Sequence, residues 1–599
     1  MKIRKRLAET CWIESGDAFI AASWSWPPSR CGSTGVLIVP GIAHEERITA
    51  DGVAALAGTL CGQGMPTLAI DLHGTAQSAG NLNSDDIGER WREDIRAAAR
   101  HLRSTGVGQI VVIGVRLGAL LAIEALQGEP IAAFVAWSPV VSGRRYLREL
   151  KVLQSAGAVE GDSREGELSV AGHVVPAPVR THLGTLDLIH CAGGSAQRVL
   201  LLDAESRLTD RWVERFEQAG SRIDRHASTQ VDHWLFGMNE RPMIPDTDIQ
   251  VIAEWCTRLP PALPALPASS AATAPRAPAM AEEVSFMHGG RMIRERVVSI
   301  GPVGLSAVLS EPVAAPPSGA VRLLMTMVGP GRMFPDFARD EASRGKTCLR
   351  FDFAGFSNSN RRRRSIPGNF YALGNAEDIV DALAHLRASG YRNAVTLGFC
   401  AGAWSMIQTG PVQGVAAAAA INVALYRQAD FETHELIKRR GHVVSKLISL
   451  LRRTRRSSGY ADKIERTLKV MLDPIRWLRA YCRSEVPLML CFGGTDAGLP
   501  YLEKQLGSEI DTLQRRGVLS IQRYRGLGHL TEGAEARRKM LLEVSAFFGA
   551  IDDKAAVDSP RHADADRDAA SAEQRGLQPA ARPSTSVGAP AGHAPIVSS

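Results

Sequence analysis

Short apolar runs alternate with amphipathic stretches through most of the chain, and glycine-containing turns separate them. In the second half, residues 321–328, 393–397 and 486–492 are apolar runs of strand length. Residues 403–407 continue directly from one such run with the spacing of a helix start. Strands that alternate with helices predict an α/β fold with a mostly parallel sheet and helices on both faces.

The most informative turn follows the apolar run 393–397. There the sequence Gly-Phe-Cys-Ala-Gly places Cys400 between Gly398 and Gly402, just before the predicted helix. A tight strand-to-helix turn brings two backbones close together, so small residues are required at the flanking positions. We therefore predict a nucleophile elbow that holds the Cys400 side chain above the sheet edge in a strained conformation.

Two partners for this cysteine come later in the chain. Asp496 follows the apolar run 486–492, and His529 follows a predicted strand at 519–524. The order nucleophile, acid, histidine, each on a loop after a strand, is that of the α/β-hydrolase fold. In this interpretation His529 takes the thiol proton and Asp496 orients the imidazole. The alternative is a buried structural cysteine, a turn aspartate and a surface histidine that do not meet.

An oxyanion hole in this fold uses two backbone amides. Residues 348–359 resemble the R-x-D-x-x-G-x-x-x-S segment common in α/β-hydrolases. The amide after the nucleophile, that of Ala401, is the first predicted donor, and the loop after the earlier strand supplies the second. Pro330 has no N–H, so Gly329 or Gly331 must be that second donor.

The first half of the chain repeats this plan without a nucleophile. Residues 36–41, 67–74 and 110–118 correspond to the strand-and-turn segments of the second half. At the apex of the corresponding elbow stands Arg116, which cannot act as a nucleophile. Either Arg116 is a fixed cation that binds a carboxylate or phosphate, or the domain is degenerate and kept for packing.

The acid of the first half is also replaced. An ungapped alignment of 199–202 with the strand before the second-half aspartate places Arg207 at the acid position. Glu205 and Asp210 lie nearby and could substitute after a small shift. His233 matches the histidine position, but a histidine alone does little, so we predict no hydrolysis in this half.

Two family resemblances follow from these motifs. Residues 40–47 and 114–122 resemble the α/β-hydrolase-like proteins associated with exosortase and exopolysaccharide gene clusters in Gram-negative bacteria, which also place arginine at the elbow. The second half is similar to serine aminopeptidase-like and thioesterase-like hydrolases, with Cys400 in place of the commoner serine. The resemblance implies tandem α/β-hydrolase domains and a role in envelope polysaccharide or lipid metabolism, but this fold hosts many chemistries.

The internal repeat divides the 599 residues into two domains and their connecting segments. The expected parts are a degenerate domain at 1–258, a Pro/Ala-rich linker at 259–280, an α/β-hydrolase domain at 281–551 with a helical cap at about 424–485, and a disordered tail at 552–599.

Positive charge is concentrated in the predicted cap. The net charge is +7, and residues 438–483 contain many arginines and lysines with few acids. A second cationic loop lies at 361–364. The cap has three interpretations: a solvated helical surface, a binding site for a phosphate-bearing acyl thioester of coenzyme A or of a carrier protein, and a surface that docks on anionic lipid. Binding of nucleic acid is disfavoured, because no binding motif accompanies the charge. The predicted substrate-binding residues are Arg452, Arg453, Arg455 and Arg456.

Cysteine usage and hydropathy indicate the compartment. The nine cysteines form no C-x-x-C pair and show no metal-ligand spacing with histidine, so we expect no metal and no cofactor. An odd number of cysteines scattered along the chain is typical of a protein in a reducing cytoplasm. The basic start lacks the apolar core of a signal peptide. The sequence also contains no run of about 18 apolar residues, the length needed to span a membrane.

Together these features predict a cytoplasmic hydrolase or acyltransferase that acts on an ester or thioester through Cys400, His529 and Asp496. The alternative is a non-catalytic scaffold or ligand-binding protein of an envelope-polysaccharide or exosortase pathway.

Overall fold

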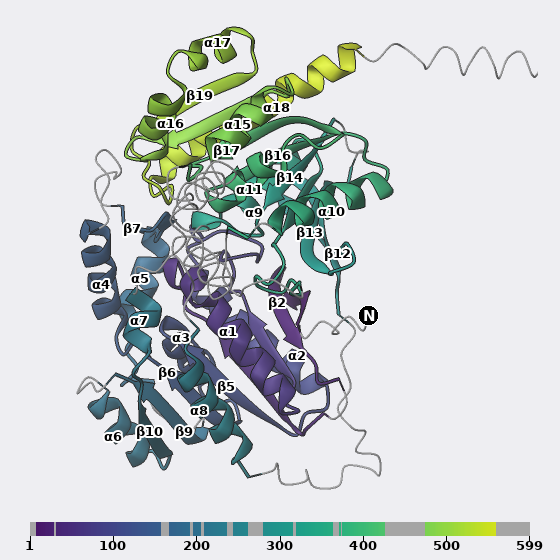
Figure 1. The fold of residues 1–599 in the computed structure, drawn as a ribbon. Coiled ribbons are helices and arrows are strands. Elements are labelled where there is room, and N and C mark those ends of the chain that lie inside the picture. Colours follow the sequence, from purple (N-terminus) through teal and green to yellow (C-terminus); the bar gives the residue numbers. More distant parts are fainter. Residues whose placement is uncertain are drawn as a thin grey trace, which may run out of the picture. The chain divides into compact units, whose positions relative to one another are not determined.

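A computed structural model describes most of the chain (Figure 1). The described residues are 8–28, 31–156, 167–191, 196–204, 209–236, 244–260, 280–314, 319–362, 371–372, 374–425 and 474–558. Residues 1–551 form one compact unit. Four predicted features lie wholly or mainly outside the described residues: the linker, the cap with Arg452, Arg453, Arg455 and Arg456, the acid position at Arg207, and the tail from residue 559.

The first half is built on an eight-stranded sheet with the order β1-β2-β4-β3-β5-β6-β9-β10. The pairs β1–β2 and β2–β4 are antiparallel, and the remaining pairs are parallel. The strands are β1 Glu9–Ser15, β2 Ala18–Ser25, β3 Thr34–Val39, β4 Thr67–Ile70, β5 Gln109–Val115, β6 Ile131–Trp137, β9 Ala196–Asp203 and β10 Arg222–Ala227, with the separate hairpin β7 Ser169–Val170 and β8 His173–Val174.

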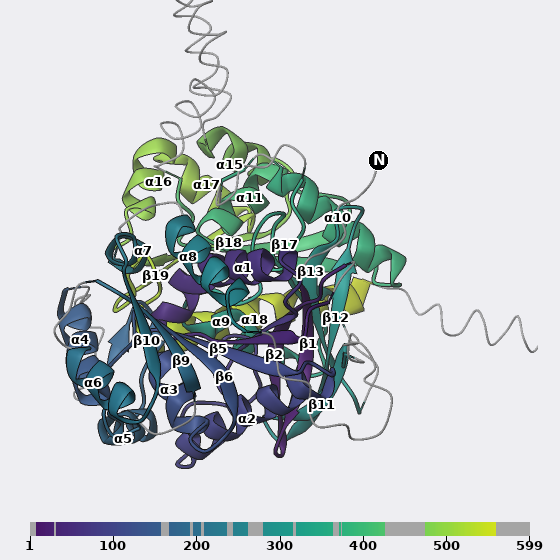
Figure 2. The same ribbon diagram turned by 90° about the horizontal axis from the view of Figure 1, so that it is seen from below.

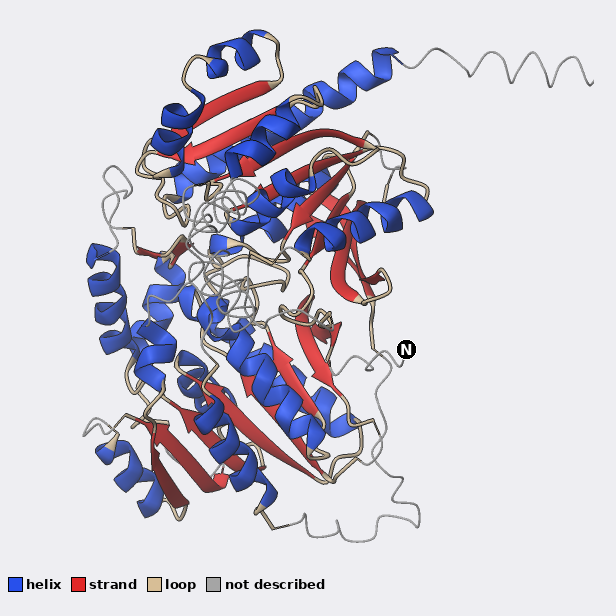
Figure 3. Cartoon of the chain, viewed as in Figure 1, coloured by secondary structure: helices blue, strands red, loops and turns tan. Residues whose placement is uncertain are grey.

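Helices cover both faces of this sheet (Figure 1, Figure 3). Alternate residues of β3 explain why: Leu37 and Val39 pack in the core that includes α2 and α3, whereas Val36 and Ile38 pack in the core that includes α1 and α8. A strand buried on both faces is apolar at every position, which is the pattern seen in the sequence. The helices are α1 His44–Gly62, α2 Ile87–Ser104, α3 Leu117–Ala125, α4 Gly143–Ala156, α5 Ala177–Thr185, α6 Asp210–Gln218, α7 Val231–Phe236 and α8 Asp246–Thr257.

The second half is built on a nine-stranded sheet with the order β11-β12-β13-β15-β14-β16-β17-β18-β19. From β15 onwards all pairs are parallel. The strands are β11 Glu283–His288, β12 Arg291–Ile300, β13 Leu305–Pro312, β14 Val321–Met325, β15 Cys348–Phe351, β16 Ala394–Phe399, β17 Val415–Ile421, β18 Leu488–Gly493 and β19 Leu519–Tyr524.

Helices α10, α11 and α15 pack on one face of this second sheet, and α9 and α18 pack on the other (Figure 2). The helical segments are η1 Pro330–Arg332, α9 Met333–Ser343, α10 Asn375–Ala388, α11 Ala401–Thr409, α15 Pro474–Cys482, α16 Gly498–Leu506, α17 Glu509–Arg515 and α18 Ala534–Asp558. Helix α18 continues past residue 551, so the first residues of the predicted tail are helical and not disordered; the stretch 552–557, Asp-Asp-Lys-Ala-Ala-Val, includes helix-favouring Ala and Lys.

The two sheets share one topology, apart from the additional strand β11. Strands β3, β4, β5, β6, β9 and β10 occupy the positions of β14, β15, β16, β17, β18 and β19. The chain therefore contains two α/β-hydrolase folds in tandem, as the internal repeat predicted.

Buried polar contacts join the two halves. Arg339, which is 1 % exposed, forms an ion pair with Glu295 at 2.8 Å and donates to the backbone carbonyls of Gln77 and Ser78 at 2.6 and 2.9 Å. Arg350 is a second partner of Glu295, at 2.9 Å. Burial alone would raise the pKa of Glu295, but these two guanidinium groups lower it to about 2. The carboxylate is thus charged and fixes Arg339 against the first half.

Within the described residues, no helix combines the length and the apolar character needed to cross a membrane.

Candidate active site

Cys400 lies at the turn between β16 and α11, as the elbow motif predicted. Its φ and ψ are 48° and −111°, a strained conformation for a residue with a side chain. A Cβ on Gly398 would lie 2.6 Å from the Ala403 backbone, and a Cβ on Gly402 would lie 2.8 Å from the Met325 carbonyl oxygen. Both flanking glycines are therefore required by close backbone approach.

The structure brings the three predicted triad residues together. His529 Nε2 lies 3.2 Å from Cys400 Sγ, and His529 Nδ1 lies 2.5 Å from Asp496 Oδ2. The histidine follows β19 and the aspartate follows β18, so adjacent parallel strands deliver both side chains to the same sheet edge. This is the chain of contacts that a nucleophile, base and orienting acid require.

Asp496 is held in one orientation. It is 4 % exposed, and its second oxygen, Oδ1, accepts the Gly498 N–H at 2.7 Å. With one carboxylate oxygen fixed by the backbone, the other is directed at the imidazole. That contact places the histidine proton on Nδ1 and leaves Nε2 for the thiol.

The electrostatics favour a thiolate–imidazolium pair. Burial alone would raise the pKa of Cys400, but hydrogen bonds from His529, Tyr371 and the Ala401 amide, with the imidazolium charge, bring that pKa below its ordinary value. Burial alone would lower the pKa of His529, yet Asp496 and the Cys400 sulfur raise it to about 10. A stabilised thiolate is the form that a cysteine nucleophile requires.

Tyr371 is a site residue that the sequence analysis missed. Its hydroxyl lies 3.4 Å from Cys400 Sγ, within the limit for a hydrogen bond to sulfur. The ring stands edge-on to Trp404 of α11, with centroids 6.1 Å apart. No motif marked this tyrosine, because it lies in a loop whose path depends on the tertiary structure.

Asn422 is a second missed residue, at the end of β17. Its Nδ2 donates to the carbonyl oxygens of Gly528 and His529 at 3.0 and 2.8 Å, and its Oδ1 accepts the Gly493 N–H at 2.8 Å. It is 1 % exposed. One amide side chain thus joins the loop that bears the histidine to the turn that precedes Asp496.

The backbone N–H groups predicted as oxyanion donors differ in whether they already have a partner within the protein. Ala401 begins α11, and its amide faces the Cys400 sulfur. The Gly331 N–H donates to His173 Nε2 at 3.3 Å, so it already has a partner within the protein. Of the two glycines named from the sequence, Gly329 therefore stays the prediction for the second donor.

The corresponding site of the first half is filled by ion pairs. Arg116 has φ 53° and ψ −121°, the same strained elbow conformation as Cys400. Its Nε contacts Glu45 Oε1 at 2.8 Å and its Nη2 contacts Glu149 Oε1 at 2.5 Å. A ligand carboxylate would have to compete with both partners, which favours the packing interpretation over a free cation. His233 lies in α7 with an exposed side chain.

Asp210 and the described part of the cationic loop have surface or structural roles. Asp210 pairs with Arg225 at 2.9 Å on an exposed surface. In the loop predicted as cationic, Arg362 pairs with Asp378 at 2.5 Å and with Asp381 at 3.0 Å. The charge of Arg362 is therefore balanced within the protein, and this residue does not contribute the free positive charge we expected there.

One arginine of the first half interacts electrostatically with Cys400. This residue, Arg47, lies in the first helical turns of α1. Desolvation by the surrounding protein lowers the pKa of Arg47, and the negative charge of Cys400 opposes that effect. No local sequence pattern marks Arg47, because it lies in the other half of the chain.

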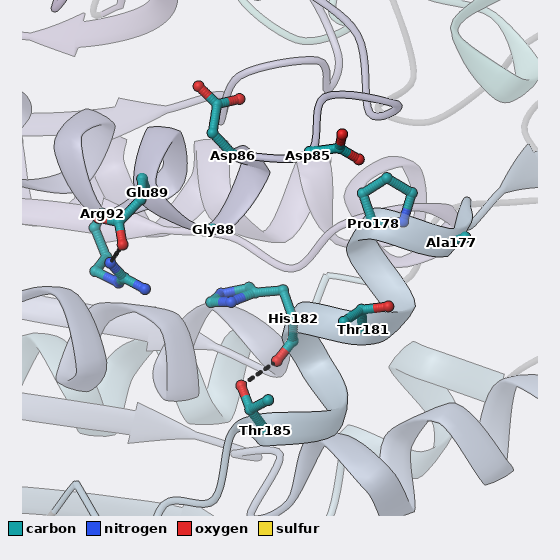
Figure 4. Close-up of a pocket in the computed structure, with 10 residues that line it drawn as sticks. All are labelled: Asp85, Asp86, Gly88, Glu89, Arg92, Ala177, Pro178, Thr181, His182 and Thr185. Carbon is teal, nitrogen blue, oxygen red and sulfur yellow. Dashed lines mark hydrogen bonds and ion pairs between the residues drawn. The ribbon is translucent and has the colours of Figure 1, made fainter.

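A cleft of about 420 Å³ lies elsewhere, between α2 and α5 (Figure 4). None of its lining residues belongs to the triad, and three of them, Asp85, Asp86 and Glu89, are acidic. Among the residues that the structure describes, no group of three or more His, Cys, Asp and Glu side chains could hold a metal ion.

Comparison with known proteins gives structural neighbours only. No protein-family model matches the chain, and no curated protein matches it. Solved structures that resemble it include an esterase of Pyrococcus furiosus (16 % identity, TM-score 0.30, 42 % of this chain and 90 % of that one). A second is the ferulic acid-bound Est1E of Butyrivibrio proteoclasticus (18 % identity, TM-score 0.30, 41 % of this chain and 98 % of that one). A third is a proline iminopeptidase of Mycobacterium smegmatis (15 % identity, TM-score 0.30, 42 % of this chain and 98 % of that one).

Proposed function

We propose that the second half of the chain is an acyl-transferring enzyme that acts on an ester or thioester, with Cys400 as its nucleophile. The observation that supports this most directly is the pair of contacts from His529, 3.2 Å to the Cys400 sulfur and 2.5 Å to the Asp496 carboxylate. A non-catalytic scaffold would not need this arrangement at a strained turn.

In the first step the Cys400 thiolate attacks the substrate carbonyl carbon and forms a tetrahedral intermediate. The bond from that carbon to the leaving oxygen or sulfur then breaks, and the leaving group takes the proton of the His529 imidazolium. The product is a thioester between the acyl group and Cys400. The Ala401 N–H and the amide of Gly329 are the proposed donors to the negatively charged oxygen.

In the second step water or an acceptor hydroxyl attacks the thioester carbon. His529, now neutral, removes the attacking proton, and the carbon–sulfur bond breaks to regenerate the thiolate and the imidazolium. Asp496 stabilises the charged imidazole without taking a proton itself. The same residues serve hydrolysis and transfer, and the acceptor decides between them.

We propose that the substrate carries an anionic group, such as the phosphates of coenzyme A or of a carrier-protein arm. Arg47 of the first half interacts electrostatically with Cys400. The arginines 452, 453, 455 and 456 stay predicted substrate-binding residues. Participation in envelope polysaccharide or lipid metabolism rests on the family resemblance of the first half. The first half itself is proposed to be non-catalytic, because Arg116 stands where a nucleophile is needed.

Selective alkylation tests the proposal. Burial raises the pKa of Cys11, Cys256 and Cys491 to about 12 and of Cys191 and Cys482 to about 11. The pKa values of Cys31, Cys61 and Cys348 are also raised. Iodoacetamide near pH 7 should therefore modify Cys400 first and abolish turnover of an activated thioester in parallel. Modification of another thiol first, or unchanged turnover after Cys400 is alkylated, would contradict it.

A further inference from the structure

The β7–β8 hairpin belongs to the inactive first half but contacts catalytic loops of the second half. Its turn is formed by Ala171 and Gly172, both with positive φ (48° and 83°). The hairpin pairs only with itself in the described sheets, with Ser169 opposite Val174 and Val170 opposite His173. Its function in the fold is therefore not to extend either of the large sheets.

The first contact is with the loop that follows β14. His173 Nε2 accepts the Gly331 N–H at 3.3 Å, and His173 is 8 % exposed. An imidazole nitrogen that accepts a hydrogen bond must be unprotonated. The surroundings support that state: burial first, and then the charges of Arg537, Arg47 and His44, hold the pKa of His173 well below its ordinary value.

Close backbone packing reinforces this contact. Gly331 has φ 56°, and a Cβ at this position would lie 2.1 Å from the Gly172 carbonyl oxygen and 2.5 Å from Arg537 Nη1. The hairpin turn thus lies directly against the loop in which Gly329 is the predicted second oxyanion donor. A shift of the hairpin cannot occur without a shift of this loop.

The second contact is with the loop that follows His529. Arg537 Nη1 donates to the carbonyl oxygens of both Gly172 and Thr531, at 2.5 and 2.9 Å. Ser169 Oγ donates to the Glu532 carbonyl oxygen at 3.3 Å. Thr531 is fully buried with φ 55°, so the chain beyond the catalytic histidine is held in an unfavourable conformation by these partners.

We propose that the β7–β8 hairpin is a positioning element for catalysis, through which the inactive first half holds the oxyanion loop and the histidine loop of the second half in register. The inference rests on the proposed function of the triad. It gives the first half a catalytic purpose without chemistry of its own: His173 and the Gly172 carbonyl act through Gly331, Arg537 and Thr531. Misplacement of reacting groups by about 1 Å can cost about a hundredfold in rate.

A matched pair of substitutions in the full chain tests this role. In His173→Gln the side-chain oxygen reaches the position of Nε2 and can still accept the Gly331 N–H, whereas in His173→Asn the shorter amide cannot. We expect His173→Asn to lower kcat for an activated thioester about 10- to 100-fold, with KM changed less than about threefold. His173→Gln should recover most of this loss.

The controls separate positioning from stability and from failure of the proposed chemistry. His182→Asn changes another partly buried histidine of the first half, and should leave kcat close to that of the wild type. Rates are normalised to the number of sites that iodoacetamide titrates at Cys400, so a partly unfolded variant is still informative. Wild-type kcat in His173→Asn, or equal losses in the Asn and Gln variants, would overturn the positioning role. Absence of turnover in the wild type would instead refute the proposed function.

Discussion

At the scale of single residues, the site depends on how three side chains share charge. Cys400 is held at a strained apex, His529 is within 3.2 Å of its sulfur, and Asp496 is buried at 2.5 Å from the imidazole. The carboxylate favours the imidazolium, and the imidazolium favours the thiolate. In the proposed mechanism the nucleophile is therefore activated before any substrate binds.

Removal of the sulfur should abolish turnover. We expect Cys400→Ala to reduce thioester or activated-ester hydrolysis to the background rate, while Cys400→Ser retains a small fraction, because an alkoxide is far harder to form than a thiolate.

Asp496→Asn should lower kcat by about ten-thousand-fold, since the amide no longer fixes the correct tautomer of His529. Steady-state kinetics with a chromogenic thioester checks both, and a wild-type rate in Cys400→Ala would refute the assignment.

The pH dependence follows from the two shifted pKa values. The lowered pKa of Cys400 means that the thiolate is lost, and kcat/KM falls, only on the acidic side of that value. The imidazolium that protonates the leaving group is lost as pH rises through about 10. We expect a basic limb near pH 10, and an acidic limb at the lowered pKa of Cys400. In Asp496→Asn the basic limb should move to lower pH, and an unmoved limb would contradict the role of Asp496.

At the scale of elements, the C-terminal ends of β17, β18 and β19 are tied together by one side chain. Asn422 leaves β17 with φ 45° and bonds to the carbonyl oxygens of Gly528 and His529 and to the amide of Gly493. Loops that follow the strand ends are not held by the backbone hydrogen bonds that join neighbouring strands. The buried amide supplies the missing hydrogen bonds and sets the spacing of acid and histidine.

Asn422→Ala should therefore affect both stability and catalysis. The substitution removes the partner of the His529 carbonyl oxygen and of the Gly493 N–H. At about 1–3 kcal/mol for each orphaned group, we expect a loss of about 2–6 kcal/mol in the free energy of unfolding. Because both catalytic loops lose their link, kcat should also fall. Urea unfolding and steady-state kinetics measure the two effects.

A control for this variant is Gln408→Ala, which removes a half-buried side-chain amide from the C-terminal end of α11. Gln408 lies outside the loops that carry the acid and the histidine, so its loss should cost much less stability and leave kcat close to that of the wild type. Similar losses in the two variants would argue against a special role for Asn422.

At the scale of the whole molecule, two copies of one fold differ in the residue at the elbow. The elbow of the first half keeps its backbone conformation, yet Arg116 fills it with ion pairs to Glu45 and Glu149. The second half keeps the triad geometry and contacts the first half through Arg339, Gly331 and Arg537. The first half, with Arg116 at its elbow, thus still makes buried contacts with the second half.

Arg116→Ser in the Cys400→Ala background should not create a hydrolase. The new hydroxyl would lie beside the buried Glu45 without a triad, and removal of the cation leaves carboxylates uncompensated. We expect background activity and a loss of about 3–5 kcal/mol in the free energy of unfolding, the usual cost of breaking a buried ion pair. Calorimetry and an esterase assay test this. Robust activity would show that the first half has an acid and base that we did not recognise.

Local sequence determined much of this protein. Apolar runs of strand length predicted the parallel strands, because a strand buried on both faces must be apolar throughout. The glycines around Cys400 predicted the elbow, since only they permit the backbone approach observed at Gly398 and Gly402. Chain order then predicted that Asp496 and His529 would meet the cysteine, as parallel strands deliver their following loops to one edge.

Only the tertiary structure decided the rest. Asn422 joins loops 71 and 107 residues away, and His173 accepts a hydrogen bond from an amide 158 residues distant. The same holds for the two carboxylates that neutralise Arg116. Such contacts leave no period and no spacing in the sequence, because a side-chain hydrogen bond depends on where two folded segments meet and not on the residues beside either partner.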